Sequence, residues 1–187
     1  NYIYTEGKRL ETMALRLLDI IVARREEIER KNTNVSGIFT YLQEIYGEKK
    51  NPEDSGVKVD IRWEKGELYG EENLLKTVLI NLTDNAIKAS EAGRTVVIVG
   101  SRRENGYYFQ VLDEGIGIPE EECHKITEAF YMVDKSRARA NNGAGLGLAL
   151  CTSILKLHHS RLEIKSTLGE GSCMSFLIPD EGVEPDE

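Results

Sequence analysis

The stretch from Glu71 to Ala92 constrains the fold more than any other part of the sequence. Its apolar residues recur at the spacing of one helix face, and they are Val78, Leu79, Leu82, Ala86 and Ala89. This pattern predicts a long amphipathic helix. Because an amphipathic helix must bury its apolar face, we expect this helix to pack against a sheet.

The same helix would carry Asn81, Asn85 and Lys88 at positions i, i+4 and i+7, on one face beside the apolar one. Amide oxygens suit a partly hydrated Mg²⁺, and a lysine ammonium is a point charge that suits phosphate. Polar residues in such places can also simply mark the boundary with solvent. From this stretch alone, both interpretations stay open.

Composition limits the class of protein. The chain has 187 residues, 40% of them hydrophobic and 30% charged, which is typical of one globular domain with an appendage. Its net charge of −8 argues against nucleic-acid binding, which needs a basic face. The sequence contains neither a signal-peptide pattern nor an apolar run of membrane-spanning length. Cys123, Cys151 and Cys173 are expected to be reduced thiols in or near the core of a cytoplasmic domain.

Residues 1–31 are predicted to form a separate amphipathic helix that precedes a domain at 32–187. Its apolar residues have heptad-like spacing, and they include Ile3, Leu10, Met13, Leu17 and Ile20. One such helix cannot bury its own apolar face, so it should pair with a copy of itself or with another helix. Because the chain starts inside this pattern and without methionine, we expect it to be a fragment of a longer protein.

The domain itself mixes helices and strands without a regular βαβ alternation. Helices are expected at 35–46, 71–92 and 146–157, and strands at 57–63, 67–69, 95–102, 107–112, 161–166 and 173–178. We expect strand 67–69 to pair with strand 57–63, and Asn105-Gly106 to close a hairpin. The predicted fold class is therefore α/β, a two-layer sandwich with helices on one face of a mixed, mostly antiparallel sheet.

Two glycine-containing segments could bind a ligand. The segment 113–119 (DEGIGIP) follows a strand, so its carboxylate could accept a hydrogen bond from an exocyclic amine while its glycines admit a ligand. The segment 143–148 (GAGLGL) opens a helix, whose free N–H groups could bind phosphate. Each motif is weak alone. The first could be a plain turn, and the second matches neither a Walker loop nor a dinucleotide fingerprint.

A long polar loop, residues 113–143, contains basic residues that could act on phosphate. Lys135, Arg137 and Arg139 could reach a γ-phosphate as a lid closes, and Phe130 could anchor that lid in an apolar notch. Loop charges are often merely solvated, and buried aromatic rings often merely pack.

The order of these motifs is more specific than any one of them. The paired asparagines on a helix, the segment 113–119, Phe130-Tyr131 with its basic loop, and the segment 143–148 resemble the N, G1, F and G2 boxes of two-component sensor histidine kinases. The resemblance covers roughly residues 33–179 and implies their catalytic, ATP-binding domain, with the Bergerat (GHKL) fold. The helix at 1–31 is similar to the second helix of the dimerisation and phosphoacceptor hairpin.

The resemblance implies a role for each matching residue. Asn85, with Asn81 behind it, would hold the Mg²⁺ that bridges the phosphates, and Lys88 would contact phosphate. Asp113 would bind the adenine amino group, and Ser172 would reach the water network beside it. The other residues implied in ATP binding are Gly115, Gly117, Ile118, Phe130, Lys135, Arg137, Arg139, Gly143, Gly145, Leu146, Gly147 and Leu148.

The implied activity is transfer of the γ-phosphate of Mg-ATP to a histidine, and from there to an aspartate of a response regulator receiver domain. The family's phosphoacceptor histidine precedes an acidic residue, whereas His124, His158 and His159 do not. The acceptor helix should therefore lie outside this chain, on the same or a partner protomer. His158 and His159 are expected at the surface. The full-length protein is expected to be a membrane-anchored homodimer.

Two departures and two alternative functions remain. Met132 stands where many members have a basic residue, and Ala144 replaces a frequent hydroxyl residue.

Related ATPases of the gyrase, mismatch-repair and chaperone type place a glutamate one turn before the metal-binding asparagine. This chain has Asn81 there, which cannot act as a base. A nucleotide-binding regulatory module without kinase activity is the other alternative.

Overall fold

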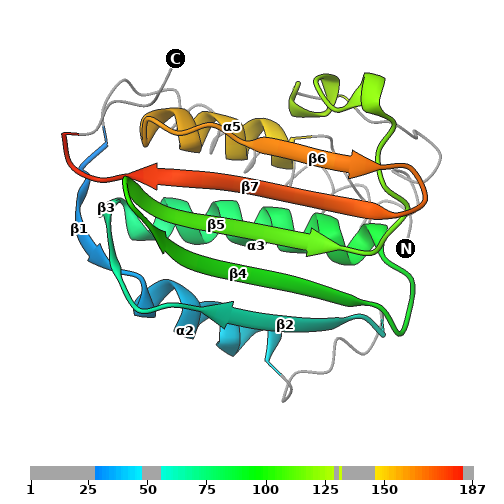
Figure 1. Ribbon diagram of the computed structural model, residues 1–187, viewed down its shortest axis with the longest axis horizontal. Helices are drawn as coiled ribbons and strands as arrows, with labels where there is room; N and C mark the ends of the chain where they lie inside the picture. Colours follow the sequence, from blue (N-terminus) through cyan, green and yellow to red (C-terminus); the bar gives the residue numbers. More distant parts are fainter. Residues whose placement is uncertain (1–27, 48–55, 129–130, 132–145, 183–187) are drawn as a thin grey trace, which may run out of the picture.

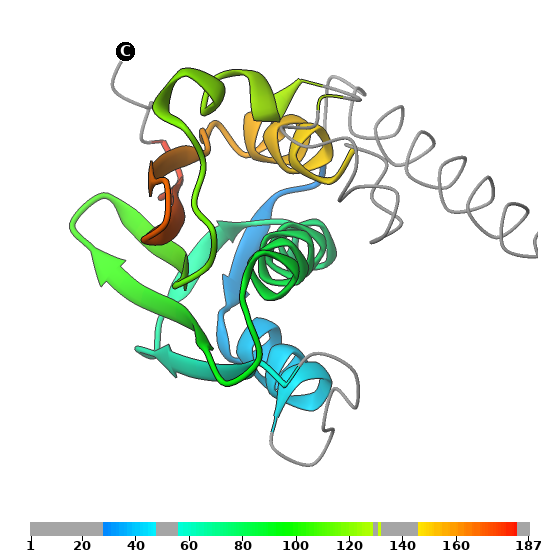
Figure 2. The same ribbon diagram turned by 90° about the vertical axis from the view of Figure 1, so that its right-hand side faces the viewer.

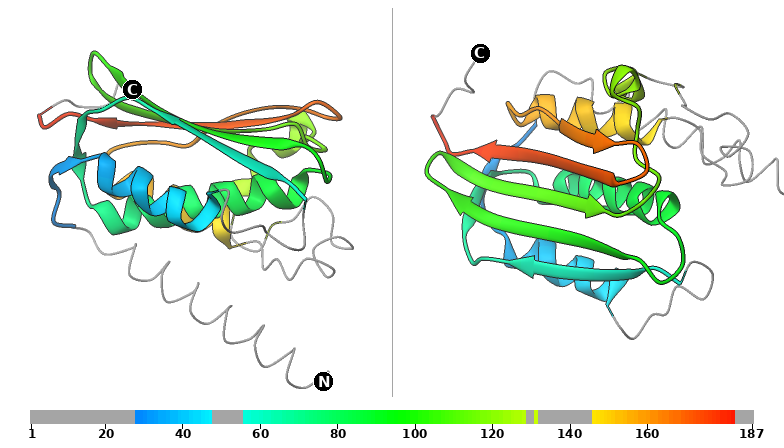
Figure 3. Two further views of the ribbon diagram at one scale, coloured as in Figure 1. Left: turned by 90° about the horizontal axis from the view of Figure 1, so that it is seen from below. Right: turned by 45° about the vertical axis from the view of Figure 1, so that its right-hand side comes forward.

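The computed structural model describes residues 28–47, 56–128, 131 and 146–182. A five-stranded sheet forms one layer and α-helices cover one face of it, as the left view of Figure 3 shows. The helices are α2 (Ser36–Tyr46), α3 (Glu72–Ala89) and α5 (Gly147–Leu157). The strands are β1 (Lys31–Asn34), β2 (Lys58–Trp63), β3 (Glu67–Gly70), β4 (Thr95–Arg103), β5 (Gly106–Asp113), β6 (Glu163–Thr167) and β7 (Gly171–Pro179).

The sheet has the strand order β2-β4-β5-β7-β6 (Figure 1). Strand β2 runs parallel to β4, and the other pairs are antiparallel. The predicted Asn105-Gly106 hairpin is present, because Arg103 pairs with Gly106 at the end of β4 and β5. The prediction of a mixed, mostly antiparallel sheet with helices is confirmed.

The predicted organising helix is α3, which lies between α2 and α5 and is seen nearly end-on in Figure 2. The Glu71 carboxylate caps its start by accepting the backbone N–H groups of Asn73 and Leu74. Its buried residues face the sheet, and they are Leu75, Val78, Leu79, Leu82, Thr83 and Ala86. The helix ends at Ala89, earlier than expected, because Ser90 leaves the helical conformation with a ψ of 150°, while its hydroxyl donates to the carbonyl of Ala86.

Aromatic side chains join the layers at one end of the core. Phe39 of α2 is fully buried and stacks on Trp63 of β2, with ring centroids 5.1 Å apart. It also stacks on Phe109 of β5 at 5.8 Å, and Phe109 in turn stacks on Phe176 of β7 at 5.0 Å. These contacts connect an edge strand, two central strands and a helix in one continuous apolar cluster.

The predicted pairing of strand 67–69 with strand 57–63 is wrong. Strand β3 pairs instead with β1, a strand the sequence did not indicate, and together they form a separate two-stranded sheet. The physical reason is that the chain does not reverse after β2. The Glu64 N–H still bonds to the Gly100 carbonyl of β4, and the Glu64 carbonyl accepts the Tyr107 hydroxyl.

The prediction of a surface position for His158 is also wrong. His158 is fully buried, its Nε2 accepts the Glu71 N–H at 3.0 Å, and its Nδ1 lies 2.8 Å from the Ile154 carbonyl oxygen. The ring therefore connects the end of α5 to the start of α3. His159 is exposed, as expected.

Other sequence expectations have mixed outcomes. Cys151 is buried, with its Sγ 3.7 Å from the Val78 carbonyl oxygen, and Cys123 and Cys173 are half-buried. Within the predicted long loop, the described residues form two short 3₁₀ turns, η1 (Glu120–Glu122) and η2 (Lys125–Thr127). No helix in the described part of the chain is long and apolar enough to cross a bilayer. Residues 1–27 of the predicted N-terminal helix lie outside the described residues, so its separation from the domain stays a prediction.

Candidate nucleotide site

The polar face of α3 carries the three residues predicted to act on metal and phosphate. The side-chain amide of Asn81 donates from Nδ2 to the Thr77 carbonyl at 2.8 Å, which fixes its orientation along the helix. Asn85 is half-buried and Lys88 is exposed. Among the residues that the structure describes, neither the Asn85 amide nor the Lys88 ammonium has a hydrogen-bond or ion-pair partner. Both groups are therefore available to a ligand.

The 113–119 loop is bonded to the end of α3 and to the β6–β7 hairpin. The Ile116 N–H donates to the Ala89 carbonyl at 3.1 Å, which joins the loop to the last residue of α3. On the other side, the Gly169 N–H donates to the Ile116 carbonyl at 2.8 Å, and the Ile118 N–H donates to Ser166 Oγ at 2.8 Å. The loop is thus held between two elements that are distant in sequence.

Two glycines make this close packing possible. A Cβ at Gly115 would lie 2.5 Å from the Ala89 carbonyl oxygen, and one at Gly117 would lie 2.0 Å from the Thr167 carbonyl oxygen. Gly117 also has a φ of +65°, a backbone conformation that other residues rarely adopt. The glycines predicted for pocket shape therefore fix how the loop packs on its neighbours.

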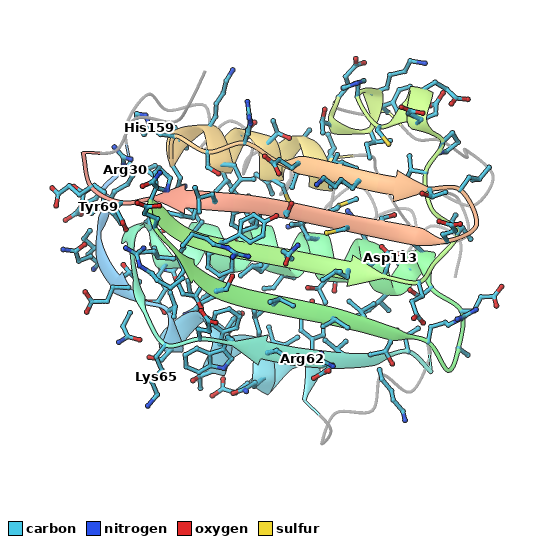
Figure 4. The ribbon with its side chains drawn as sticks, viewed as in Figure 1. Arg30, Arg62, Lys65, Tyr69, Asp113 and His159 are labelled. Atoms are coloured by element: carbon cyan, nitrogen blue, oxygen red, sulfur yellow. The ribbon has the colours of Figure 1, made fainter. Side chains whose placement is uncertain are left out.

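Asp113 ends β5 at the point where this loop begins (Figure 4). Its carboxylate accepts the Gly115 N–H at 2.9 Å. Burial raises the pKa of Asp113 above its ordinary value, while the backbone N–H groups of Gly115 and Ser172 and the Ser172 hydroxyl donate to the carboxylate and oppose that shift. The carboxylate is half-buried, fixed in orientation, and suited to accept one more hydrogen bond from a ligand amine.

Ser172 and Ser166 form a hydroxyl pair beside this carboxylate, with their Oγ atoms 2.9 Å apart. The Ser172 hydroxyl donates to Asp113, and the Ser166 hydroxyl donates to the Gly171 carbonyl at 2.8 Å. The sequence predicted Ser172 but missed Ser166. Only the pairing of Ser166 with Ser172 across β6 and β7 could have revealed it, and that pairing is not a local signal.

A cavity of about 770 Å³ opens around Asp113, Ser166 and Ser172. It continues past Leu112 and Cys173, which alternate with the buried residues of β5 and β7 and so lie on the face away from the helices. Among the described residues, none of α3 lines this cavity, so it lies beside the Asp113 end of the candidate site and not along Asn85 and Lys88. We assign only its part near Asp113 to the candidate site.

The second glycine-rich segment is described from Leu146 onward, where α5 begins. Leu146 and Gly147 are buried, Leu148 is half-buried, and no side chain of the described residues caps the helix. The remaining predicted residues lie outside the described residues, and they are Phe130, Lys135, Arg137, Arg139, Gly143 and Gly145. Met132 and Ala144 lie outside them too. Tyr131 is described, and its hydroxyl donates to the Glu122 carboxylate of η1.

Comparisons with known proteins identify the family. Residues 70–182 match the family described as "Histidine kinase-, DNA gyrase B-, and HSP90-like ATPase". The phosphate regulon sensor protein PhoR of Haemophilus influenzae is 41% identical over 112 residues, which make up 60% of this chain and 26% of that protein. The chain spans between 15% and 29% of the length of the first curated relatives that it matches.

Solved structures show the same fold. One is full-length ShkA in complex with AMPPNP, with a TM-score of 0.75 and 24% identity, over 94% of this chain and 36% of that chain. Another is histidine kinase ThkA in complex with response regulator protein TrrA, with a TM-score of 0.72 and 24% identity, over 96% of this chain and 50% of that chain. Since the family match covers more than half of its residues, the chain belongs to the histidine kinase-, DNA gyrase B- and HSP90-like ATPase family, as a catalytic and ATP-binding domain of the sensor histidine kinase type.

Proposed function

We propose that this domain binds Mg-ATP between α3 and the 113–119 loop and transfers the γ-phosphate to a histidine on a separate helix. The observation that carries the proposal is the bond between the Ile116 N–H and the Ala89 carbonyl. It couples the loop that holds Asp113 to the helix that holds Asn85 and Lys88. An adenine acceptor and phosphate ligands are thereby kept in one fixed arrangement.

At the base-binding end, the Asp113 carboxylate accepts the adenine 6-amino group. Its orientation is fixed by the donors from Gly115 and Ser172. Guanine carries a carbonyl oxygen where adenine has this amine, and an oxygen facing a carboxylate is repelled. The site should therefore select adenine over guanine nucleotides.

At the phosphate end, the Asn85 amide suits a metal ligand and the Lys88 ammonium suits a phosphate contact, since neither has a partner within the described part of the chain. The described residues contain no group of three His, Cys, Asp or Glu side chains that could hold a metal. A hard cation would therefore depend on the Asn85 amide oxygen, phosphate oxygens and water, which is a donor set that suits Mg²⁺. When bound, Mg²⁺ would neutralise charge on the phosphates during transfer.

The chain's own contribution to the reaction is position and charge. Lys88 holds a phosphate oxygen, and the N–H groups at the start of α5 add positive partial charge from the helix end. The segment that closes over the phosphates is proposed to include Phe130, Lys135, Arg137, Arg139, Gly143 and Gly145. The attacking imidazole comes from outside the chain, and its nitrogen displaces ADP at the γ-phosphorus.

Hydrolysis of ATP is the weaker alternative, because Asn81 stands where the related ATPases have a catalytic glutamate. An amide nitrogen that donates to the Thr77 carbonyl cannot accept a proton from water. A regulatory module that binds nucleotide without transferring phosphate would share the same pocket. Phosphotransfer to an added histidine helix separates these functions.

For the whole protein, we propose a homodimer, anchored in the membrane, that phosphorylates a response regulator receiver domain. Two similar proteins support this role: PhoR is a phosphate regulon sensor protein, and histidine kinase ThkA was solved in complex with response regulator protein TrrA. The proposed pocket faces the cytoplasm, where ATP is available. The acceptor histidine would lie on the same or the partner protomer.

Calorimetric titration of Mg-ATP into the wild-type protein tests the proposal. We expect micromolar to sub-millimolar binding that weakens when Mg²⁺ is chelated. Asn85→Ala should lose most of this Mg²⁺ dependence, and Asp113→Asn should bind ATP roughly tenfold more weakly. Asn73→Ala, an exposed amide in the first turn of the same helix, is the matched control and should bind normally. A folded wild-type protein that does not bind Mg-ATP would contradict the proposal.

A second assay tests the transfer step. The protein is incubated with γ-labelled Mg-ATP and a phosphoacceptor hairpin from a related sensor kinase. Label on the hairpin that is stable in alkali and labile in acid supports kinase activity. Release of free phosphate without labelled hairpin would support the ATPase, and nucleotide binding without either product would support the regulatory module.

A further inference from the structure

A hydrogen bond next to the phosphate end has no role in the function proposed so far. Tyr46, the last residue of α2, donates its hydroxyl proton to Asp84 Oδ1 at 2.7 Å. The Ile80 carbonyl oxygen lies 3.5 Å from the same hydroxyl, so the Asp84 carboxylate is the principal acceptor. Asp84 immediately precedes Asn85 in α3.

Asp84 is also four residues before Lys88, so the two side chains share one side of the helix. An acidic residue four positions before a lysine is the favoured orientation for an ion pair on a helix. The first turns of α3 contain such a pair, because Glu72 Oε1 lies 2.6 Å from Lys76 Nζ. In the described part of the chain Asp84 and Lys88 form no ion pair, although their spacing is the same.

The difference between the two pairs is the tyrosine. Burial raises the pKa of Tyr46, and the hydrogen bond to Asp84 raises it further, so the hydroxyl keeps its proton and remains a donor at all physiological pH values. The Asp84 carboxylate is half-buried and turned toward α2 by this donor. Lys88 is exposed, and its ammonium has no ion-pair partner among the residues that the structure describes.

We propose that Tyr46 is a positioning residue that holds the Asp84 carboxylate away from Lys88 and so keeps the Lys88 ammonium free for nucleotide phosphate. This inference rests on the proposed function of the same site. Without the tyrosine hydroxyl, Asp84 would turn toward Lys88 and compete with phosphate for it. The carboxylate would also lie closer to the phosphates and repel them.

The test is a set of calorimetric Kd values for Mg-ATP. Tyr46→Phe should weaken binding roughly two- to fivefold, because an exposed ion pair of this spacing is modest in strength. Tyr46→Phe combined with Asp84→Asn should restore wild-type affinity, since the competing charge is gone. The weakening should also shrink as salt concentration rises. A loss of packing alone would show neither the rescue nor the salt dependence.

Two further variants make the result specific. Tyr41→Phe removes a hydroxyl from an exposed tyrosine of the same helix and should leave the Kd unchanged. In a Lys88→Met background, Tyr46→Phe should have no additional effect, because the ammonium it protects is absent. Asp84→Asn alone should bind Mg-ATP as tightly as the wild type or more tightly, and this holds even if Tyr46→Phe fails to fold.

The failures of the two proposals differ. A wild-type protein that does not bind Mg-ATP contradicts the proposed function, and the role of Tyr46 with it. A wild-type protein that binds normally, together with an unchanged Tyr46→Phe or a weakened Asp84→Asn, overturns only the role of Tyr46. Equal weakening by Tyr46→Phe in the wild-type and Lys88→Met backgrounds overturns it as well.

Discussion

His158 is a buried histidine with a structural role and no catalytic one. Burial lowers its pKa below the ordinary value of 6.5, and the nearby Arg30 guanidinium lowers it further, while the contacts with Ile154 and Glu71 oppose the shift. Its neutral Nε2 accepts the Glu71 N–H, and Glu71 in turn caps α3. A protonated ring could not accept that N–H, so folding favours the neutral form.

We therefore expect acid to destabilise the domain partly through His158. As pH falls below about 6.5, the unfolded chain binds a proton at this residue before the folded chain does. The free energy of unfolding should then fall by at most about 1.4 kcal/mol per pH unit from this group. Urea denaturation between pH 7.5 and 5.5 measures the slope, which His158→Gln should reduce.

The neighbouring histidine provides the control for this prediction. His159 is exposed and has a φ of +54°, which asparagine adopts readily. His159→Asn should keep the wild-type slope of stability against pH. An equal reduction of the slope in both variants would show that the burial of His158 is not its cause.

At the scale of elements, the decisive feature is the 113–119 loop held between α3 and the β6–β7 hairpin. Its position depends on Gly117, where a Cβ would meet the backbone of Thr167. Gly93, in the turn between α3 and β4, also has a positive φ, of +86°, but a Cβ there would meet no atom of the described residues within 4 Å. A Cβ at Gly93 would cause backbone strain alone, whereas a Cβ at Gly117 would cause strain and steric overlap. Comparing substitutions at the two glycines therefore distinguishes these effects.

Gly117→Ala should destabilise the domain by roughly 3 kcal/mol or more, since strain and steric overlap add. Gly93→Ala should cost only about 1 kcal/mol, because strain acts alone. Displacement of the loop should also weaken Mg-ATP binding at least tenfold in Gly117→Ala, with no change in Gly93→Ala. Urea denaturation and calorimetry measure both effects. Similar stability losses in the two variants would contradict the packing role of Gly117.

This scale also explains what the sequence could predict. Asn81, Asn85 and Lys88 lie within one helix, and the segment 113–119 is contiguous, so local spacing was enough to find them. The pairing of β1 with β3 and the bond from Ile118 to Ser166 join residues that are far apart in the chain. The burial of His158 depends on a donor 87 residues away. Such contacts leave no local pattern to read.

Across the whole molecule, Phe39 connects the layers through its aromatic contacts. It is fully buried, and its ring lies so close to Gly100 of β4 that a Cβ there would be 2.2 Å from Phe39 Cζ. The stack on Trp63 extends this contact to the edge strand β2. Loss of the ring would therefore open a cavity between α2 and the sheet.

Phe39→Ala should lower the free energy of unfolding by about 3–5 kcal/mol. Trp63 is the single tryptophan of the chain and stacks on Phe39, so its fluorescence reports the transition in urea. Phe39→Leu, which fills more of the space, should lose less. If alanine and leucine were equally destabilising, the cavity would not be the cause.

The positions of β1 and Asp113 have a mechanical consequence. Arg30 and Tyr69 lie at one end of the sheet and Asp113 lies at the other (Figure 4). The eighteen residues of α3 separate these ends by about 27 Å. Residue 28, the first described residue, therefore lies at the end of the domain remote from the candidate nucleotide site. A 30° rotation of the domain about β1 would move the candidate site along an arc of about 14 Å. A small change of angle at β1 therefore gives a large displacement of the site.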